Sequence, residues 1–271
     1  MPRVSVVIPC YNQGMYLDEA VASVLNQTFA DFEIVVVNDG STDPSTIRLL
    51  AGYAKRKTRV LSIENQGLAS ARNRGIEAAS GEYILPLDAD DAIAPGYLEK
   101  AVAVMDSNPD MGIVYCLGQL FGAEQRMIAA PEFSVRRMLF SNLIFASALF
   151  RRADWLAVGG YNPNMRHGCE DWDFWLSLIE RERKVHRIPE ILFRYRIKEG
   201  SMNASMDREK RMEMHLQIMR NHPGLFIDHA RPLLRIYYRV TGSRPYRALK
   251  RLGLFSLFPA KKGNPSGSVK D

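Results

Sequence analysis

The sequence predicts an α/β fold with a mainly parallel central sheet flanked by helices. Short apolar runs rich in valine and isoleucine alternate, over residues 4–106, with segments whose apolar residues recur at helical spacing. Each apolar run is followed directly by polar residues. Repeated strand–helix alternation is typical of parallel sheets with right-handed crossovers.

The first predicted strand, 4–9, is a short β-branched run, as expected for a strand buried on both faces. The next segment, 16–25, places Leu17, Val21 and Val24 at helical spacing. The same alternation then predicts strands at 33–37, 59–63 and 83–87, and helices at 46–57, 68–79 and 97–106.

The second half is less regular. We predict strands at 112–116, 127–130 and 147–151, helices at 134–145, 154–158 and 172–181, and a strand pair at 184–196 hinged at Pro189. These elements divide the chain into one domain, 1–200, with halves at 1–110 and 111–200, and a helical basic extension at 201–260. The last residues, 261–271, are rich in Gly, Ser, Pro and Lys and are predicted to be disordered.

Polar residues gather where the predicted strands end. Asp88, Asp90 and Asp91 follow the fourth strand, and Tyr11, Asn12, Asp39 and Asn65 follow the others. Ligands of such sheets bind beyond the carboxyl ends of the strands. Three carboxylates in four residues repel one another, and Mg²⁺ or Mn²⁺ commonly joins such oxygens to substrate phosphates. The alternative is a polar turn in which Asp91 caps the next helix.

Composition and missing motifs exclude several classes. The chain of 271 residues has three widely spaced cysteines, which predicts neither a disulfide framework nor a zinc site and fits a reducing cytosol. We recognise no signal peptide and no apolar run of membrane-spanning length. Neither GxGxxG nor GxxxxGK[ST] nor HExxH occurs, so the common nucleotide cradles and zinc-protease motif are excluded.

Three segments together resemble a known family. They are VSVVIPCYNQGMYLDEAVASVLNQTFADFEIVVVNDGSTD, ENQGLASARNRGIEAASGEYILPLDADD and GGYNPNMRHGCEDWDFWLSL. In this order and spacing they resemble glycosyltransferase family 2, over roughly residues 3–200. The resemblance implies a GT-A fold and an inverting transfer of sugar from a nucleotide diphosphate. Residues 1–110 would then bind the nucleotide sugar, and residues 111–200 the acceptor.

The resemblance implies a role for each matching residue on the donor side. The carboxylate of Asp39 would accept a hydrogen bond from uracil, and Asp88 would lie on the ribose side of the DxD pair. The full set that would bind the nucleotide sugar is Pro9, Tyr11, Asn12, Asp39, Asn65, Arg72, Asp88 and Arg196. From the residues alone, Arg72 and Arg74 could equally be solvated charges on a helix.

The resemblance also implies the catalytic and metal residues. Asp90 would hold a divalent cation, Mn²⁺ or Mg²⁺, and Asp171 would be the catalytic base. Asp171 precedes a predicted helix, whose positive end is expected to keep it ionised. Its alternative role is to cap that helix. Glu170 is the neighbouring candidate base, and Glu170 and Trp172 could contact the acceptor.

One position departs from the family pattern. Many relatives have a histidine two positions after the arginine that matches Arg196, whereas this chain has Lys198. An ammonium cannot bind a cation, but it can neutralise a diphosphate directly. We therefore expect a weaker dependence on metal.

These observations predict an inverting glycosyltransferase. Its donor would be a UDP-hexose or UDP-N-acetylhexosamine, and its acceptor a glycan or lipid-linked glycan of surface polysaccharide biosynthesis. The alternatives are a non-catalytic sugar-nucleotide or glycan-binding module and a sugar nucleotidyltransferase, which would usually carry a glycine-rich, basic first loop.

The net charge of +6 is concentrated in the C-terminal segment, where residues 230–258 mix Arg and Lys with Leu, Ile, Tyr and Phe. This mixture suits an interfacial helix, which predicts a cytoplasmic protein that touches the inner face of the cell membrane. Packing on the catalytic domain or a homodimer contact are the alternatives. Nucleic acid is not expected, since no recognition motif accompanies the charge.

Overall fold

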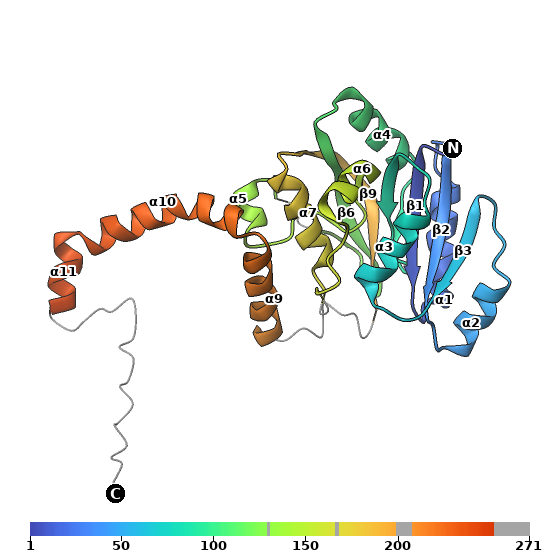
Figure 1. Ribbon diagram of the computed structural model, residues 1–271, viewed down its shortest axis with the longest axis horizontal. Coiled ribbons are helices and arrows are strands. Elements are labelled where there is room, and N and C mark those ends of the chain that lie inside the picture. Colours follow the sequence, from blue (N-terminus) through green and yellow to red (C-terminus); the bar gives the residue numbers. More distant parts are fainter. Residues whose placement is uncertain (129–130, 166–167, 199–207, 252–271) are drawn as a thin grey trace, which may run out of the picture. The chain divides into compact units, whose positions relative to one another are not determined.

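The computed structural model describes residues 1–128, 131–165, 168–198 and 208–251. Within these residues, nine strands form one sheet in the order β3-β2-β1-β4-β8-β6-β9-β5, with β7 paired to β6. The chain divides into two units, Met1–Leu225 and Phe226–Asp271. The sheet and the helices that cover it belong to the first unit (Figure 1).

The first half of the sheet confirms the predicted parallel arrangement. Strands β1 (Val4–Cys10), β2 (Phe32–Asp39), β3 (Thr58–Ile63) and β4 (Tyr83–Pro86) pair in parallel, with β1 between β2 and β4. The connecting helices are α1 (Gly14–Leu25), α2 (Pro44–Ala51) and α3 (Leu68–Ala78). The carboxyl ends of β1, β2 and β4 therefore share one edge of the sheet.

The second half makes the sheet mixed. β8 (Leu149–Arg151) lies antiparallel between β4 and β6 (Met111–Gly122), and β6 runs parallel to β9 (Lys184–Ile197). β5 (Ala92–Ile93) pairs with β9, and β7 (Arg126–Met127) with β6. The remaining helices of this half are α4 (Tyr97–Ser107), α5 (Val135–Met138), α6 (Arg152–Val158) and α7 (Glu170–Glu180).

Two predictions for the second half were wrong. The predicted strand pair at 184–196 is the single strand β9, and its register with β6 shifts between Ile188 and Ile191. Pro189 lies in this shift because proline cannot donate to a strand ladder. The predicted helix at 134–145 ends at Met138, and the chain then leaves helical geometry and runs along a cavity.

Alternation along the strands builds a core on both faces of the sheet. Val4, Val6 and Ile8 of β1 join a cluster with α1 and α4. Val7 points to the other face, where α3 crosses closely because residue 75 is glycine. A Cβ at Gly75 would lie 2.4 Å from Cγ1 of Val7. This close packing holds α3 directly against β1 and β2.

The chain after residue 200 is described from Arg208. Helix α9 (Arg208–Asn221) is followed by α10 (Pro223–Thr241) and α11 (Arg244–Arg251). His222, at the end of α9, contacts Asp173 and Glu180 of α7 through its two ring nitrogens. The predicted disordered segment, 261–271, lies outside the described residues. In the part of the chain that is described, no helix is long and apolar enough to cross a membrane.

Candidate active site

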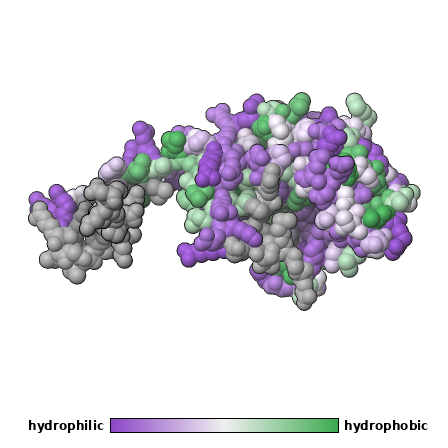
Figure 2. Space-filling model, turned by 60° about the horizontal axis from the view of Figure 1, so that its bottom comes forward, coloured by the Kyte–Doolittle hydropathy of each residue, from purple (hydrophilic) through white to green (hydrophobic). Residues whose placement is uncertain are grey.

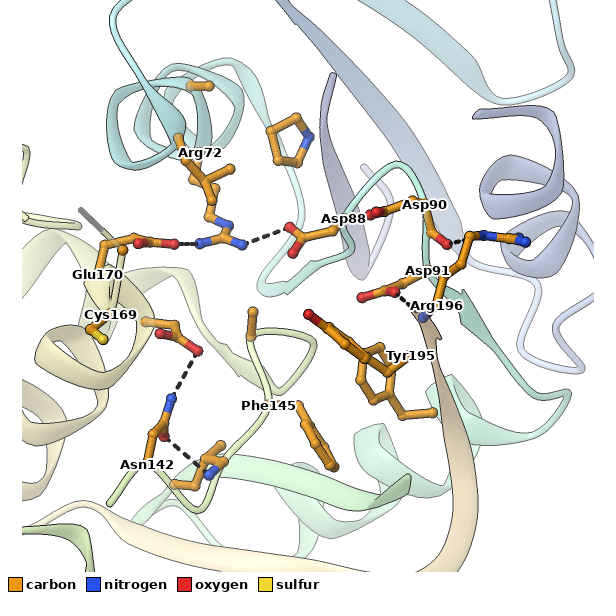
Figure 3. Close-up of a pocket in the computed structure, with 18 of the residues that line it drawn as sticks. Arg72, Asp88, Asp90, Asp91, Asn142, Phe145, Cys169, Glu170, Tyr195 and Arg196 are labelled. Atoms are coloured by element: carbon orange, nitrogen blue, oxygen red, sulfur yellow. Dashed lines mark hydrogen bonds and ion pairs between the residues drawn. The ribbon is translucent and has the colours of Figure 1, made fainter. Parts of the chain in front are cut away.

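A cavity of about 740 Å³ lies at the carboxyl ends of β1, β2 and β4. Its size is that of a typical small-molecule site. Asp39, Asp90 and Asp171, which are far apart in the sequence, line this one cavity. Figure 3 shows acidic and basic side chains from both halves of the domain facing each other across it. Other predicted residues that line it are Pro9, Tyr11, Asn65, Arg72, Asp88, Glu170 and Arg196.

Asp39 and Asn12 shape one end of the cavity. The buried Asp39 carboxylate accepts hydrogen bonds from the backbone N–H groups of Gln66 (2.9 Å) and Gly67 (3.1 Å). It thereby ties the end of β2 to the start of α3. Asn12 is not among the cavity-lining residues; its amide oxygen accepts the N–H groups of Thr42 and Asp43 at 2.8 Å. Asn12 therefore holds the loop after β2.

Each of the three clustered aspartates has its own partner. Asp88 lies 2.6 Å from Nη2 of Arg72, and Asp90 lies 2.5 Å from Nζ of Lys198. The Asp91 carboxylate accepts the backbone N–H of Arg196 at 2.9 Å. The alternative role of Asp91 as a helix cap is wrong, since α4 begins at Tyr97 with Gly96 as its cap. Protein cations and an N–H group thus offset the repulsion that first suggested a metal.

Asp91 is almost fully buried beside the other two carboxylates. Burial raises the pKa of Asp91 well above its usual range, and the negative charges of Asp88 and Asp90 raise it further. Its link to Arg196 joins the loop after β4 to the end of β9. The sequence did not single out this role, because the two residues are far apart in the chain.

Arg72 connects the two halves of the domain. Its side chain is only 1% exposed, and it bridges the carboxylates of Asp88 and Glu170 (Figure 3). The alternative of a solvated helix charge is therefore wrong for Arg72, although it holds for Arg74, which is exposed and pairs with Glu77. Glu170 is itself buried and held by Arg72, so it is less available than Asp171 to accept a proton.

Asp171 is held in place by two hydrogen bonds. Its Oδ2 accepts the side-chain N–H of Asn142 at 2.9 Å, and its Oδ1 accepts the backbone N–H of Trp172 at 2.8 Å. Burial raises the pKa of Asp171 to about 7, and the neighbouring Glu170 carboxylate contributes to the increase. The backbone N–H of Trp172 at the helix end favours the charged form, as expected, but burial has the larger effect. A pKa near 7 suits a general base.

Asn142 was missed in the sequence because it lies in the segment predicted as a helix. Trp172 was expected to face the acceptor, but its ring is buried and its Nε1 donates to the Met138 carbonyl at 2.7 Å. It is not among the residues that line the cavity. In this structure Trp172 therefore packs α7 against the end of α5, and its ring is not available to contact an acceptor.

The raised pKa of Asp171 predicts how activity depends on pH. A carboxyl group is protonated below its pKa and then cannot accept a proton. With Asp171 as the expected base, the kcat/KM of the reaction should therefore rise about tenfold per pH unit below 7 and level off above it. Replacing Asn142 by alanine removes a hydrogen bond to the charged form, so the inflection should move to higher pH.

The control for this experiment is Asn164→Ala, since Asn164 is exposed and is not among the residues that line the cavity. It should leave the profile unchanged. A profile that stays flat from pH 5 to 8 in the unmodified protein would show that Asp171 does not titrate in the reaction.

Comparison with known proteins decides the family. The model for Glycosyl transferase family 2 matches residues 5–159, which is more than half of the chain. The chain belongs to glycosyltransferase family 2. A relative of this family 2 glycosyltransferase is the uncharacterized glycosyltransferase EpsJ of Bacillus subtilis (strain 168). The two are 30% identical over an alignment of 251 positions that covers 84% of this chain and 71% of EpsJ.

Two further proteins extend the comparison. The chondroitin synthase of Pasteurella multocida (strain Pm70) is 33% identical to this glycosyltransferase over 192 residues, covering 69% of this chain but only 20% of the synthase. The crystal structure of S. aureus TarS 1–349 in complex with UDP-GlcNAc has a TM-score of 0.67 at 22% identity, covering 81% of this chain and 66% of that one. This likeness shows the fold, a mixed α/β sheet with flanking helices of the GT-A type.

Proposed function

We propose that this glycosyltransferase is an inverting enzyme that uses a UDP-hexose or UDP-N-acetylhexosamine as donor. The observation that carries the proposal is that Asp171, with a pKa of about 7, lines the same cavity as Asp88, Asp90 and Asp91. The TarS complex contains UDP-GlcNAc, and the match to a chondroitin synthase supports a glycan or lipid-linked acceptor in surface polysaccharide synthesis.

The proposed reaction uses residues on opposite sides of the cavity. Asp171 accepts the proton of an acceptor hydroxyl as its oxygen attacks the anomeric carbon. The bond between that carbon and the diphosphate breaks on the other face, and the nucleoside diphosphate leaves with the electron pair. Attack from the face opposite to the leaving group inverts the configuration, as in inverting glycosidases.

The nucleotide would lie along the ends of β1 and β2. Tyr11 is half exposed there and would meet the base, and Asp39, which two backbone N–H groups hold in place, would accept a further hydrogen bond from uracil. Pro9 and Asn65 line the same end of the cavity. Asn12 would act by holding the loop after β2, and Arg72 by holding Asp88, rather than by meeting the donor directly.

The residues present fit a divalent cation only in part. Asp90 would hold Mn²⁺ or Mg²⁺, and such an ion, when bound, would neutralise charge on the diphosphate. Mg²⁺ often uses one or two carboxylates together with substrate phosphates, so one aspartate can suffice. Among the described residues, no three His, Cys, Asp or Glu side chains form a ready metal site, and Asp90 is already paired with Lys198.

Calorimetric titration tests the donor. A panel of UDP, GDP and CDP sugars should give binding with the uridine compounds only, since the proposed Asp39 contact reads uracil. Replacing Asp39 by alanine should weaken binding of the uridine compounds, and it should also loosen the loop before α3. The control is Asp110→Ala, since Asp110 is an exposed residue that pairs with Lys184. Equal binding of all nucleotides, or of none, would contradict the UDP donor.

We also propose that the second unit touches the cytoplasmic face of a membrane. Arg231, Arg235 and Arg239 recur every fourth residue of α10. Exposed apolar side chains lie between and beside them along the helix, and Figure 2 shows hydrophobic and hydrophilic residues mixed on the visible surface of this helix. They are Ile227, Leu234, Ile236, Tyr238 and Val240. Basic amphipathic helices bind anionic lipid surfaces in this way.

Vesicle sedimentation checks this contact. The protein should bind vesicles that contain phosphatidylserine and not pure phosphatidylcholine vesicles. Changing the three arginines together to glutamate should abolish binding, since each contributes about 1 kcal/mol near an anionic surface. If the triple variant sedimented with these vesicles as much as the unmodified protein does, α10 would be excluded as the membrane-binding surface.

A further inference from the structure

Lys198 is a cation that lines the cavity beside Asp90. Its Nζ lies 2.5 Å from Oδ2 of Asp90 and 5.2 Å from the ring centre of Tyr16. Its side chain is 23% exposed and lines the cavity, so it is held in place yet open to a ligand. The position follows from the fold, because β9 pairs with β5 directly after the aspartate loop.

Among the described residues, two other cations line the cavity, Arg196 and Arg72, and each of them is held by two acidic or carbonyl partners. The Arg196 guanidinium donates through Nε to the Asp90 carbonyl at 2.8 Å and pairs through Nη2 with Glu19. Arg72 is buried between two carboxylates. The expected diphosphate contact of Arg196 is therefore less direct than that of Lys198, whose ammonium meets a carboxylate of the cavity itself.

The ammonium and a metal would compete for the same carboxylate. A divalent cation held by Asp90 would either displace Lys198 from Oδ2 or lie beside its ammonium and be repelled by it, while Asp88 is paired with Arg72 and Asp91 receives the Arg196 N–H. A lysine ammonium is a compact charge that binds phosphate well. Positive charge aimed at the leaving group stabilises it whether a metal or a side chain supplies the charge.

We propose that Lys198 binds the diphosphate of the donor and supplies the positive charge that a divalent cation would otherwise supply, so that nucleotide binding by this chain does not require metal. This inference rests on the proposed function, since it needs a nucleoside diphosphate in the cavity. On binding, the ammonium moves from Asp90 to the diphosphate or bridges the two.

Calorimetry with UDP, in EDTA and in Mn²⁺, tests the proposal. The unmodified protein should bind UDP about equally in both conditions. Lys198→Ala should bind UDP roughly 10- to 100-fold more weakly in EDTA, as expected for loss of a charged hydrogen bond. Lys198→His should be equally weak in EDTA and regain affinity in Mn²⁺, because an imidazole can bind the metal beside Asp90.

Lys184→Ala is the matched control, since Lys184 begins β9 whereas Lys198 directly follows its end, and it should bind UDP like the unmodified protein. Electron paramagnetic resonance of Mn²⁺ gives a readout without nucleotide. Lys198→Ala should bind the ion more tightly than the unmodified protein, because Asp90 is released.

Two results would overturn the assignment of Lys198 and leave the donor intact. They are UDP binding by the unmodified protein that is lost in EDTA, and UDP binding by Lys198→Ala in EDTA that equals that of the unmodified protein. Failure of the unmodified protein to bind UDP in either condition would instead reject the proposed donor, and the role of Lys198 with it.

Discussion

Replacing Asp171 by asparagine should lower kcat for sugar transfer by roughly 10²- to 10⁴-fold, the contribution usual for a general base. Asparagine has nearly the same shape and can still accept the Trp172 N–H, but it cannot take a proton from the acceptor. Donor binding should be unchanged, since the proposed contacts of the nucleotide lie at the ends of β1, β2 and β4. The measurement is UDP release in the presence of acceptor, together with calorimetry of UDP binding.

The control for Asp171→Asn is the same change at an aspartate outside the cavity. Asp110→Asn changes an exposed aspartate that pairs with Lys184, and it should leave both quantities unchanged. Near-normal turnover by Asp171→Asn would reject this residue as the base and favour Glu170. Absence of turnover in the unmodified protein, with donor binding retained, would favour the alternative of a binding module.

Replacing Arg72 by methionine should lower the free energy of unfolding by about 3–5 kcal/mol, the usual cost of breaking a buried ion pair from one side. The change leaves Glu170, which is buried, and Asp88 without their shared cation. Because Arg72 joins the loop after β4 to α7, donor affinity should fall as well. Urea denaturation measures the first effect and calorimetry the second.

Arg74→Met is the matched control on the same helix. Arg74 is 56% exposed and pairs only with Glu77 among the ion pairs of the described residues, so its loss should change stability by no more than about 0.5 kcal/mol. Combining Arg72→Met with Glu170→Gln should recover part of the loss, because the second change removes the unpaired charge. Equal effects of the two arginine changes would refute the proposed bridge.

Local patterns explain why the first half of the fold could be predicted. The runs around Val6 and Val35 are too short and too β-branched for helices, and the segment from Leu17 to Val24 has helical spacing. Their alternation leaves parallel pairing as the natural outcome, which places Asp39 and Asp90 at one edge. The second half lacked such periodicity, so the helix at 134–145 and the hinge at Pro189 were mistaken.

The sequence by itself determined the family, the parallel half of the sheet and the acidic residues of the cavity, because these depend on residue types at short spacing. Tertiary structure alone decided which charged and polar side chains meet. Lys198 reaches Asp90, Arg72 reaches Glu170 and Asn142 reaches Asp171 across 29 to 108 positions of the chain. Burial, which no local pattern records, raises the pKa of Asp171 toward neutrality.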